Sequence, residues 1–277
     1  MTGPPTIQPK GFHFGLSGGW IVDAVSANIG EYLDTSIDDA LGRPITTLFS
    51  NDTIHDVRNR LALLRGDDGI EHLFHFPLSV DRQAFDLTLY RNGSGFGIDA
   101  EPCTERGLGD ATGILGGMLS RVAPSDDIGQ LCDQAGNQLR ALTGFEQVVI
   151  SADHEQLGRS VRAGATPIDA KNTSADDDLI VFDRDAAAVP IHAIDDDWVA
   201  RRLTWRSPVA SEVARLASIG ARAALIVPLD RGGRPWGQAA CYHSAPRHVS
   251  AERRNIARLF AQIVSLRIEL AELRRVA

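Results

Sequence analysis

The chain has 277 residues, of which 43% are hydrophobic and 23% are charged. This length fits two average domains, and the composition is typical of a globular protein that buries sizeable cores. A net charge of −8 argues against a nucleic-acid-binding surface, which needs a basic face. No apolar run approaches the ~18 residues of a membrane span, and the N-terminus lacks the basic and apolar regions of a signal peptide. The three cysteines are widely separated, which indicates a cytoplasmic protein without a disulfide framework or a zinc site.

The first hundred residues predict an α+β domain. Residues 1–11 form an irregular N-terminal segment, because prolines and glycines leave little room for regular structure. The expected elements are strands at 12–16 and 20–25, short helices at 27–33 and 36–41, a longer helix at 52–65, and strands at 71–78, 83–90 and 96–100. Asn92–Gly93 makes the last turn. This order over residues 12–101 is typical of a PAS domain.

A linker at residues 102–110 leads into a second α+β domain that covers residues 111–277. We expect helices at 111–122 and 126–142, with Ser125 as a cap and Gly144 as a left-handed end, and then strands at 145–150 and 179–182. The acidic stretch 176–197 is interpreted as a solvated loop, not as a metal site of Asp176, Asp177 and Asp178. With the hairpin and helix that follow, this order is typical of a GAF domain.

The end of the chain predicts a hairpin and a long helix. Strands at 223–229 and 236–243 enclose a turn with Gly232 and Gly233, and the helix covers about 250–277. Its apolar residues alternate at spacings of three and four, which is the seam of a two-helix contact. They are Ile256, Leu259, Ile263, Leu266, Leu270 and Leu273. This seam predicts a homodimer, and the alternative is an amphipathic helix that lies on its own sheet.

Dispersed motifs, in the right order, resemble the PAS–GAF part of a bacterial phytochrome. They include Ile7-Gln-Pro-Lys-Gly11, Leu139-Arg-Ala-Leu-Thr-Gly-Phe145, Ala187-Ala-Val-Pro190 and Trp236-Gly-Gln-Ala-Ala-Cys241. The resemblance implies that a linear tetrapyrrole occupies the GAF pocket, and that light isomerises it. It also implies a signal that passes along the helical spine to a kinase or response regulator, as in two-component signalling. In the family the N-terminal strand threads a GAF insertion as a knot.

When the family's bilin-binding residues are matched one by one to this sequence, most of those positions carry a different residue. Bacterial members attach biliverdin through a cysteine before the Ile-Gln-Pro segment, and residues 1–6 contain none. Others use a cysteine near the histidine of a Ser-Pro-x-His segment, and Ser207–Ala210 has neither; a second alignment places Glu212 at the histidine position. The pocket's Tyr-Arg pair falls on Ser151 and Ala152, which removes a propionate-binding cation.

The hairpin departs from the family in the same direction. Its serine falls on Ala224 and its first histidine on Tyr242, although His243 keeps the second histidine. Nothing between Gly164 and Leu179 resembles the family's Pro-x-Ser-Asp-Ile-Pro stretch, so the insertion looks shortened and the knot is left open. Burying the propionates and pyrrole N–H groups of a bilin without partners costs several kcal/mol.

The sequence therefore predicts a non-catalytic, phytochrome-like sensory module that carries no cofactor. No motif for catalysis or metal binding is recognised. The candidate residues of a degenerate pocket are Tyr242, His243, Glu212 and Ser151. One alternative is a red/far-red photoreceptor that binds biliverdin non-covalently, and another is a GAF receptor for a different small ligand, such as a nucleotide or haem.

Overall fold

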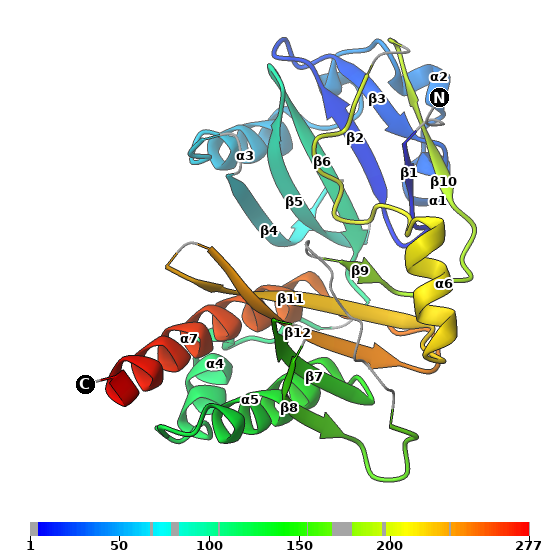
Figure 1. The fold of residues 1–277 in the computed structure, drawn as a ribbon. Coiled ribbons are helices and arrows are strands. Elements are labelled where there is room, and N and C mark those ends of the chain that lie inside the picture. The colour runs from blue at the N-terminus through cyan, green and yellow to red at the C-terminus, as the bar shows by residue number, and fades with distance from the viewer. Residues whose placement is uncertain are drawn as a thin grey trace. The chain divides into compact units, whose positions relative to one another are not determined.

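The computed structural model describes residues 5–66, 69–78, 83–104, 106–153, 155–167, 179–195, 198–232 and 234–276 (Figure 1). The acidic residues Asp176 to Asp178 and the turn residue Gly233 lie outside these ranges. Within them, no helix has both the length and the apolar character that crossing a bilayer requires.

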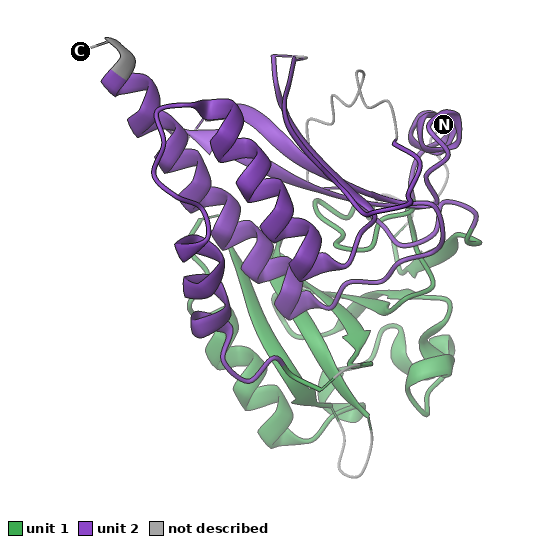
Figure 2. Ribbon diagram, turned by 90° about the horizontal axis from the view of Figure 1, so that it is seen from below, with its two compact units in different colours: residues 1–107, 186–207 green, residues 108–185, 208–277 purple. Residues whose placement is uncertain are grey.

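The chain forms two compact units, which Figure 2 shows in different colours. Unit 1 contains residues 1–107 and 186–207, and unit 2 contains residues 108–185 and 208–277. From the sequence we placed residues 186–207 in the second domain; in the structure they pack with the first.

Unit 1 is an antiparallel sheet with the strand order β1-β10-β3-β2-β6-β5-β4. Its strands are β1 (Thr6–Ile7), β2 (Phe12–Leu16), β3 (Val22–Ser26), β4 (Ile70–Pro77), β5 (Ala84–Asn92), β6 (Gly95–Pro102) and β10 (Val189–Ala193). The helical elements are α1 (Ile29–Tyr32), α2 (Ile37–Ala40), the 3-10 helix η1 (Ile45–Thr47) and α3 (Asn51–Leu61). The hydrophobic core lies between these helices and one face of the sheet, and Phe12, Phe14 and Leu87 belong to it.

Helix α3 illustrates how the sequence specifies this packing. Ser50 caps it, since its Oγ accepts a hydrogen bond from the backbone N–H of Thr53 at 3.2 Å. Ile54, Val57 and Leu61 recur on one face and are all buried in the core. The helix ends at Leu61, four residues before the predicted end.

Strand β10 corrects the prediction of a solvated loop at residues 176–197. It pairs with β3 on one side and with β1 on the other, where Thr6 is opposite Pro190. The N-terminal segment also bonds to residues 205–207: the N–H of Gln8 donates to the carbonyl of Trp205 at 2.7 Å, and that of Ser207 to the carbonyl of Thr6 at 3.0 Å. The N-terminal segment is therefore held between two parts of residues 186–207.

Unit 2 contains a five-stranded antiparallel sheet in the order β8-β7-β12-β11-β9. The strands are β7 (Gln147–Ala152), β8 (Glu155–Val161), β9 (Ile180–Val181), β11 (Ala223–Arg231) and β12 (Arg234–His243). The helices are α4 (Ala111–Ser120), α5 (Ile128–Thr143), α6 (Ala210–Ser218) and α7 (Ala251–Val276). Helices α5 and α7 lie against one face of the sheet (Figure 1), and α6 packs on the other through Leu216. The predicted α+β fold, with two antiparallel sheets and a long C-terminal helix, is confirmed.

Two details of helix α5 refine the prediction. Its N-cap is Asp127, whose side chain accepts from the N–H of Gln130 at 3.2 Å, so the predicted cap at Ser125 is wrong by two residues. Gly144 ends the helix with φ of 68°, as expected of a left-handed cap.

Candidate functional site

Strand register brings two of the four candidate residues to one sheet face. Tyr242 on β12 is directly opposite Gln147 of β7 and Ala224 of β11, and Ser151 is opposite Gln238. Since side chains alternate along a strand, residues two apart share a face. We name this surface, which α6 covers, the α6-side face. Its sheet residues include Gln147, Val149, Ser151, Arg159, Val161, Val181, Ala224, Ile226, Gln238, Ala240 and Tyr242.

Tyr242 is the largest side chain on the α6-side face and is completely buried. It belongs to an apolar cluster that also includes Leu216 and Ala221, beyond the strands. Cross-strand neighbours lie about 5 Å apart at Cβ, so the small Ala224 opposite leaves room for the phenol ring. The chain's own side chains therefore occupy much of this face.

The other polar groups that β7 and β12 place on the α6-side face are neutral, whereas β8 adds Arg159, which is directly opposite Val149 and already has an interaction partner. Gln147 and Gln238 are 1% and 7% exposed, and they flank the positions of Tyr242 and Ser151 on neighbouring strands. The sequence analysis missed both glutamines, although their alternation in phase with Ser151 and Tyr242 would have placed them on this face. Amides can donate and accept hydrogen bonds, but they cannot neutralise a carboxylate.

Glu212 lies on α6 and stabilises the start of that helix. Its Oε2 accepts a hydrogen bond from the backbone N–H of Val209 at 2.8 Å, which satisfies one of the donors that a helix start leaves open. Helical spacing puts Glu212 on the same side of α6 as Arg215, Leu216 and Ile219.

His243 points to the opposite face of the sheet from Tyr242, because it is the next residue along β12. Its Nδ1 accepts from the N–H of Ala245 at 3.0 Å, and its Nε2 lies 3.9 Å from Oε1 of Glu146. The ring meets Phe145 edge-on, with 6.3 Å between centroids. The structure therefore separates His243 from Tyr242 and Ser151.

Three arginines lie near α6, and two of them are already paired. Arg222 binds both carboxylate oxygens of Asp183 at 2.7 and 2.8 Å. Arg184 donates to the carbonyls of Leu216 and Ala221 at the end of α6. Nη1 of Arg215 is buried and has no hydrogen-bond partner in the described part of the chain. Arg215 is thus the one cation of these three that remains available to an anionic ligand.

Cys241 lies beside Tyr242 and faces away from it, toward the helices. It is completely buried, and burial raises the pKa of its thiol to about 12.

Family models place the two folds along the chain. The model described as a PAS fold matches residues 1–103, and the model of the GAF domain matches residues 127–268.

The curated relatives include several phytochromes. "Phytochrome 1" of Adiantum capillus-veneris is 24% identical over 244 residues, with 70% of this chain and 22% of that protein covered. "Phytochrome-like protein Cph1" of Synechocystis is 23% identical over 282 residues, with coverage of 91% and 37%. The chain therefore spans well under half the length of either relative.

Solved structures agree with the fold. The chromophore-binding domain of a Stigmatella aurantiaca bacteriophytochrome has a TM-score of 0.80 at 21% identity, and 95% of each chain is covered. That of the bacteriophytochrome RpBphP3 from R. palustris has a TM-score of 0.78 at 21% identity, with 98% and 97% covered. The chain belongs to the GAF domain family and is a phytochrome-like PAS–GAF module, as the resemblance in its sequence predicted.

Proposed function

We propose that this sensory module is non-catalytic, that it no longer holds a bilin in its GAF domain, and that it signals as a dimer through α7. The dimer would transmit a change in the pitch or register of α7 to a downstream kinase or response regulator. Three features of unit 2 support the proposal: the packing around Tyr242, the neutral glutamines on the α6-side face, and the leucines of α7.

The burial of Tyr242 is the main observation in support of the proposal that the GAF domain no longer binds a bilin. Tyr242 and Leu216 have no exposed surface, and they pack in one apolar cluster between α6 and the sheet. A bilin carries two propionates, and burying carboxylates without cations costs several kcal/mol. Arg215 would pair with one of them. The buried sheet residues Gln147 and Gln238 are neutral, and Arg159 on β8 already has a partner within the protein.

Expression with a biliverdin source tests this directly. We expect the purified protein to carry no bilin and to show no absorption band in the red or far-red. The matched variant Tyr242→His restores the imidazole that the family resemblance implies at this position. A strong red band in the wild type that changes under illumination would support the non-covalent photoreceptor instead.

A receptor for another small ligand is the second candidate, and Arg215 favours it. A buried guanidinium nitrogen without a partner is costly, and a carboxylate or phosphate of a ligand would satisfy it. Native mass spectrometry of the purified protein would reveal a retained anionic ligand. We expect Arg215→Gln to lose that ligand, whereas Arg234→Gln in the exposed hairpin end retains it. An empty wild-type protein contradicts this second function.

The dimer proposal rests on the exposed leucines of α7. Leu259, Leu266, Leu270 and Leu273 are 42 to 59% exposed, and at about 1.5 Å per residue they form a stripe about 21 Å long. The other side of the helix is buried against its own unit through Phe260, Val264 and Ile268. Ile256, which the predicted seam includes, is 2% exposed and belongs to that inner side; Ile263 is half-buried between the two.

Charge on the stripe should separate the protomers. We expect the double variant Leu266→Glu with Leu270→Glu to be monomeric at concentrations where the wild type is dimeric, because carboxylates would be buried in an apolar seam. Sedimentation velocity or light scattering measures this. Leu63→Glu is the matched control, since Leu63 is 50% exposed in unit 1. An equally tight dimer of the double variant would contradict the proposal.

A further inference from the structure

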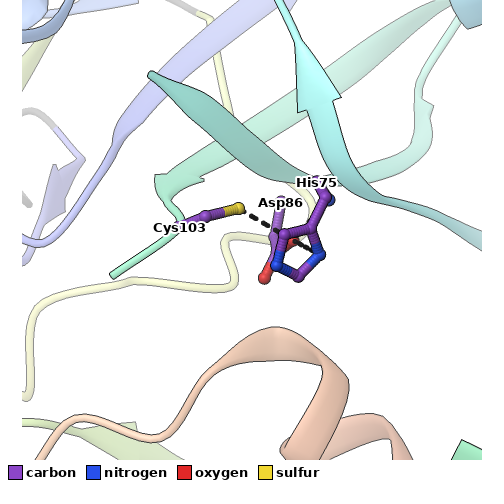
Figure 3. A group of neighbouring side chains, drawn as sticks. All are labelled: His75, Asp86 and Cys103. Atoms are coloured by element: carbon purple, nitrogen blue, oxygen red, sulfur yellow. Dashed lines mark hydrogen bonds and ion pairs between the residues drawn. The ribbon is translucent and has the colours of Figure 1, made fainter. Parts of the chain in front are cut away.

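His75, Asp86 and Cys103 lie together at one end of strands β4, β5 and β6 in unit 1 (Figure 3). The possible ligand atoms of the three side chains all lie within 4.8 Å of one another. Sγ of Cys103 is 3.2 Å and Nδ1 of His75 is 3.8 Å from Oδ1 of Asp86. We propose that this cluster binds a divalent cation of the zinc type.

A bulge in the edge strand β4 orients His75 toward the cluster. The pairing with β5 shifts register between Leu73 and Phe76, and His75 has a φ of 52°. This left-handed conformation is rare for residues other than glycine and costs of order 1 kcal/mol or more. Strain of this kind is concentrated at functional sites, where the surrounding structure holds it in place.

Asp86 is the fixed centre of the group. Its side chain is 3% exposed, and its Oδ1 accepts a hydrogen bond from the backbone N–H of His75 at 2.9 Å. Glu101 lies directly opposite on β6 and is also 3% exposed. A second carboxylate on the same face adds negative charge near the site, which favours a cation.

The backbone also positions the thiol of Cys103 and the ring of His75. The N–H of Cys103 donates to the carbonyl of Ala84 at 2.9 Å, which holds the thiol beyond the end of β6. The ring of His75 lies against Gly107, where a Cβ would be only 3.0 Å from Cε1. A side chain at position 107 would therefore press on the imidazole ring.

The donor set is one that zinc uses. Cysteine sulfur, histidine nitrogen and carboxylate oxygen are its usual ligands, and tetrahedral coordination separates neighbouring ligand atoms by about 3.5 Å. The distances of 3.2 and 3.8 Å bracket that value. On binding, the thiol proton that is directed at Asp86 passes to solvent, and the thiolate and carboxylate bind the metal. His75 is 35% exposed, which gives a cation access, and water would complete the coordination.

The sequence predicts no metal site because the three ligands are separated by 11 and 17 positions. Only the antiparallel pairing of β4, β5 and β6 brings them together. The other two cysteines, Cys132 and Cys241, are completely buried and have no such cluster among the described residues.

Cobalt titration of the whole chain, reduced and freed of metal by a chelator, tests the proposal. We expect one Co²⁺ per chain, with a thiolate-to-cobalt charge-transfer band and the visible bands of tetrahedral cobalt. Stoichiometric Zn²⁺ should displace the cobalt and raise the melting temperature of the protein, because it binds only the folded state.

Two variants remove ligands with little risk to the fold. His75→Gly deletes the imidazole and suits the positive φ, and Cys103→Ser keeps the size of the side chain. Each should weaken cobalt binding about tenfold or more and abolish the zinc-dependent rise in melting temperature. His55→Ala, on the exposed surface of α3, should bind like the wild type. The proposal is overturned if the wild type binds no cobalt, or if both ligand variants bind it unchanged.

Discussion

Buried polar groups are handled in opposite ways by the two sheets. The face of the unit 1 sheet that points away from the hydrophobic core buries His13, Tyr90 and Asp99, each under 5% exposed. The α6-side face of unit 2 buries Tyr242 with amides and apolar side chains. Buried charge is tolerated where partners surround it and is otherwise costly. The first face therefore holds a hydrogen-bonded polar network, whereas the second is packed mainly with apolar side chains around Tyr242.

Asp99 is the hub of the network in unit 1. Its Oδ1 lies 2.7 Å from Nδ1 of His13 and accepts from the hydroxyl of Tyr90 at 3.3 Å. Its Oδ2 accepts from the backbone N–H of Thr204 at 2.6 Å. Burial, with Asp99 beside it, raises the pKa of Tyr90 well above its usual range. The carboxylate of Asp99 thus links residues 198–207 to the sheet through its hydrogen bond with Thr204.

Removal of Asp99 should have the largest effect. We expect Asp99→Ala to lower the free energy of unfolding by about 3 to 5 kcal/mol, because two buried donors and one partly buried donor lose their acceptor. Urea denaturation measures this, and hydrogen exchange should show earlier opening of residues 198–207. The double variant His13→Leu with Asp99→Leu is the comparison. It removes the His13 donor together with its acceptor, so only the Tyr90 hydroxyl and the Thr204 N–H lose theirs, and the cost should be smaller. If Asp99→Ala lost under about 1 kcal/mol, the network would not hold this segment.

Some of this architecture could be predicted from sequence, because the signal for it lies within a single segment of the chain. Periodicity located α3, and Gly144 marked the end of α5. Strand β10 was missed because its pairing with β3 and β1 depends on contacts more than 160 residues away. The same holds for Asp99 with Thr204, and for His75 with Asp86 and Cys103. Long-range register brings these groups together, and a periodic pattern within one segment carries no signal of it.

Truncation of Leu216 tests the packing on the α6-side face of unit 2. Leu216 has no exposed surface and packs with Tyr242 in the same cluster. We expect Leu216→Ala to cost about 3 kcal/mol in the free energy of unfolding, since it leaves a cavity in a filled core. Ala217→Gly, at an exposed position of the same helix, controls for helix propensity and should cost at most about 1 kcal/mol. A cost under about 1 kcal/mol for Leu216→Ala would mean that the α6-side face is an open ligand pocket.

The smallest expected effect is a change in pH dependence at Asp23, which lies at the edge of the unit 1 network. Burial raises the pKa of this carboxyl, while its own backbone N–H, the charge of His13 and a hydrogen bond from Trp198 oppose the rise. The folded protein therefore binds more protons than the unfolded chain between the unfolded pKa of about 4 and the raised pKa of the folded state. Stability contributed by protonated Asp23 is present below about pH 4 and is lost as the pH rises through the raised pKa.

Asp23→Asn should remove this loss, because its side chain does not ionise. We expect the variant's urea midpoint to fall less than the wild-type midpoint as the pH is raised above about 4. The two proteins should differ most near neutral pH, and Asp56→Asn on the exposed side of α3 should leave the wild-type slope unchanged. Parallel profiles for Asp23→Asn and the wild type would show that Asp23 is as well solvated as a surface carboxylate, and that the buried network of unit 1 ends at His13.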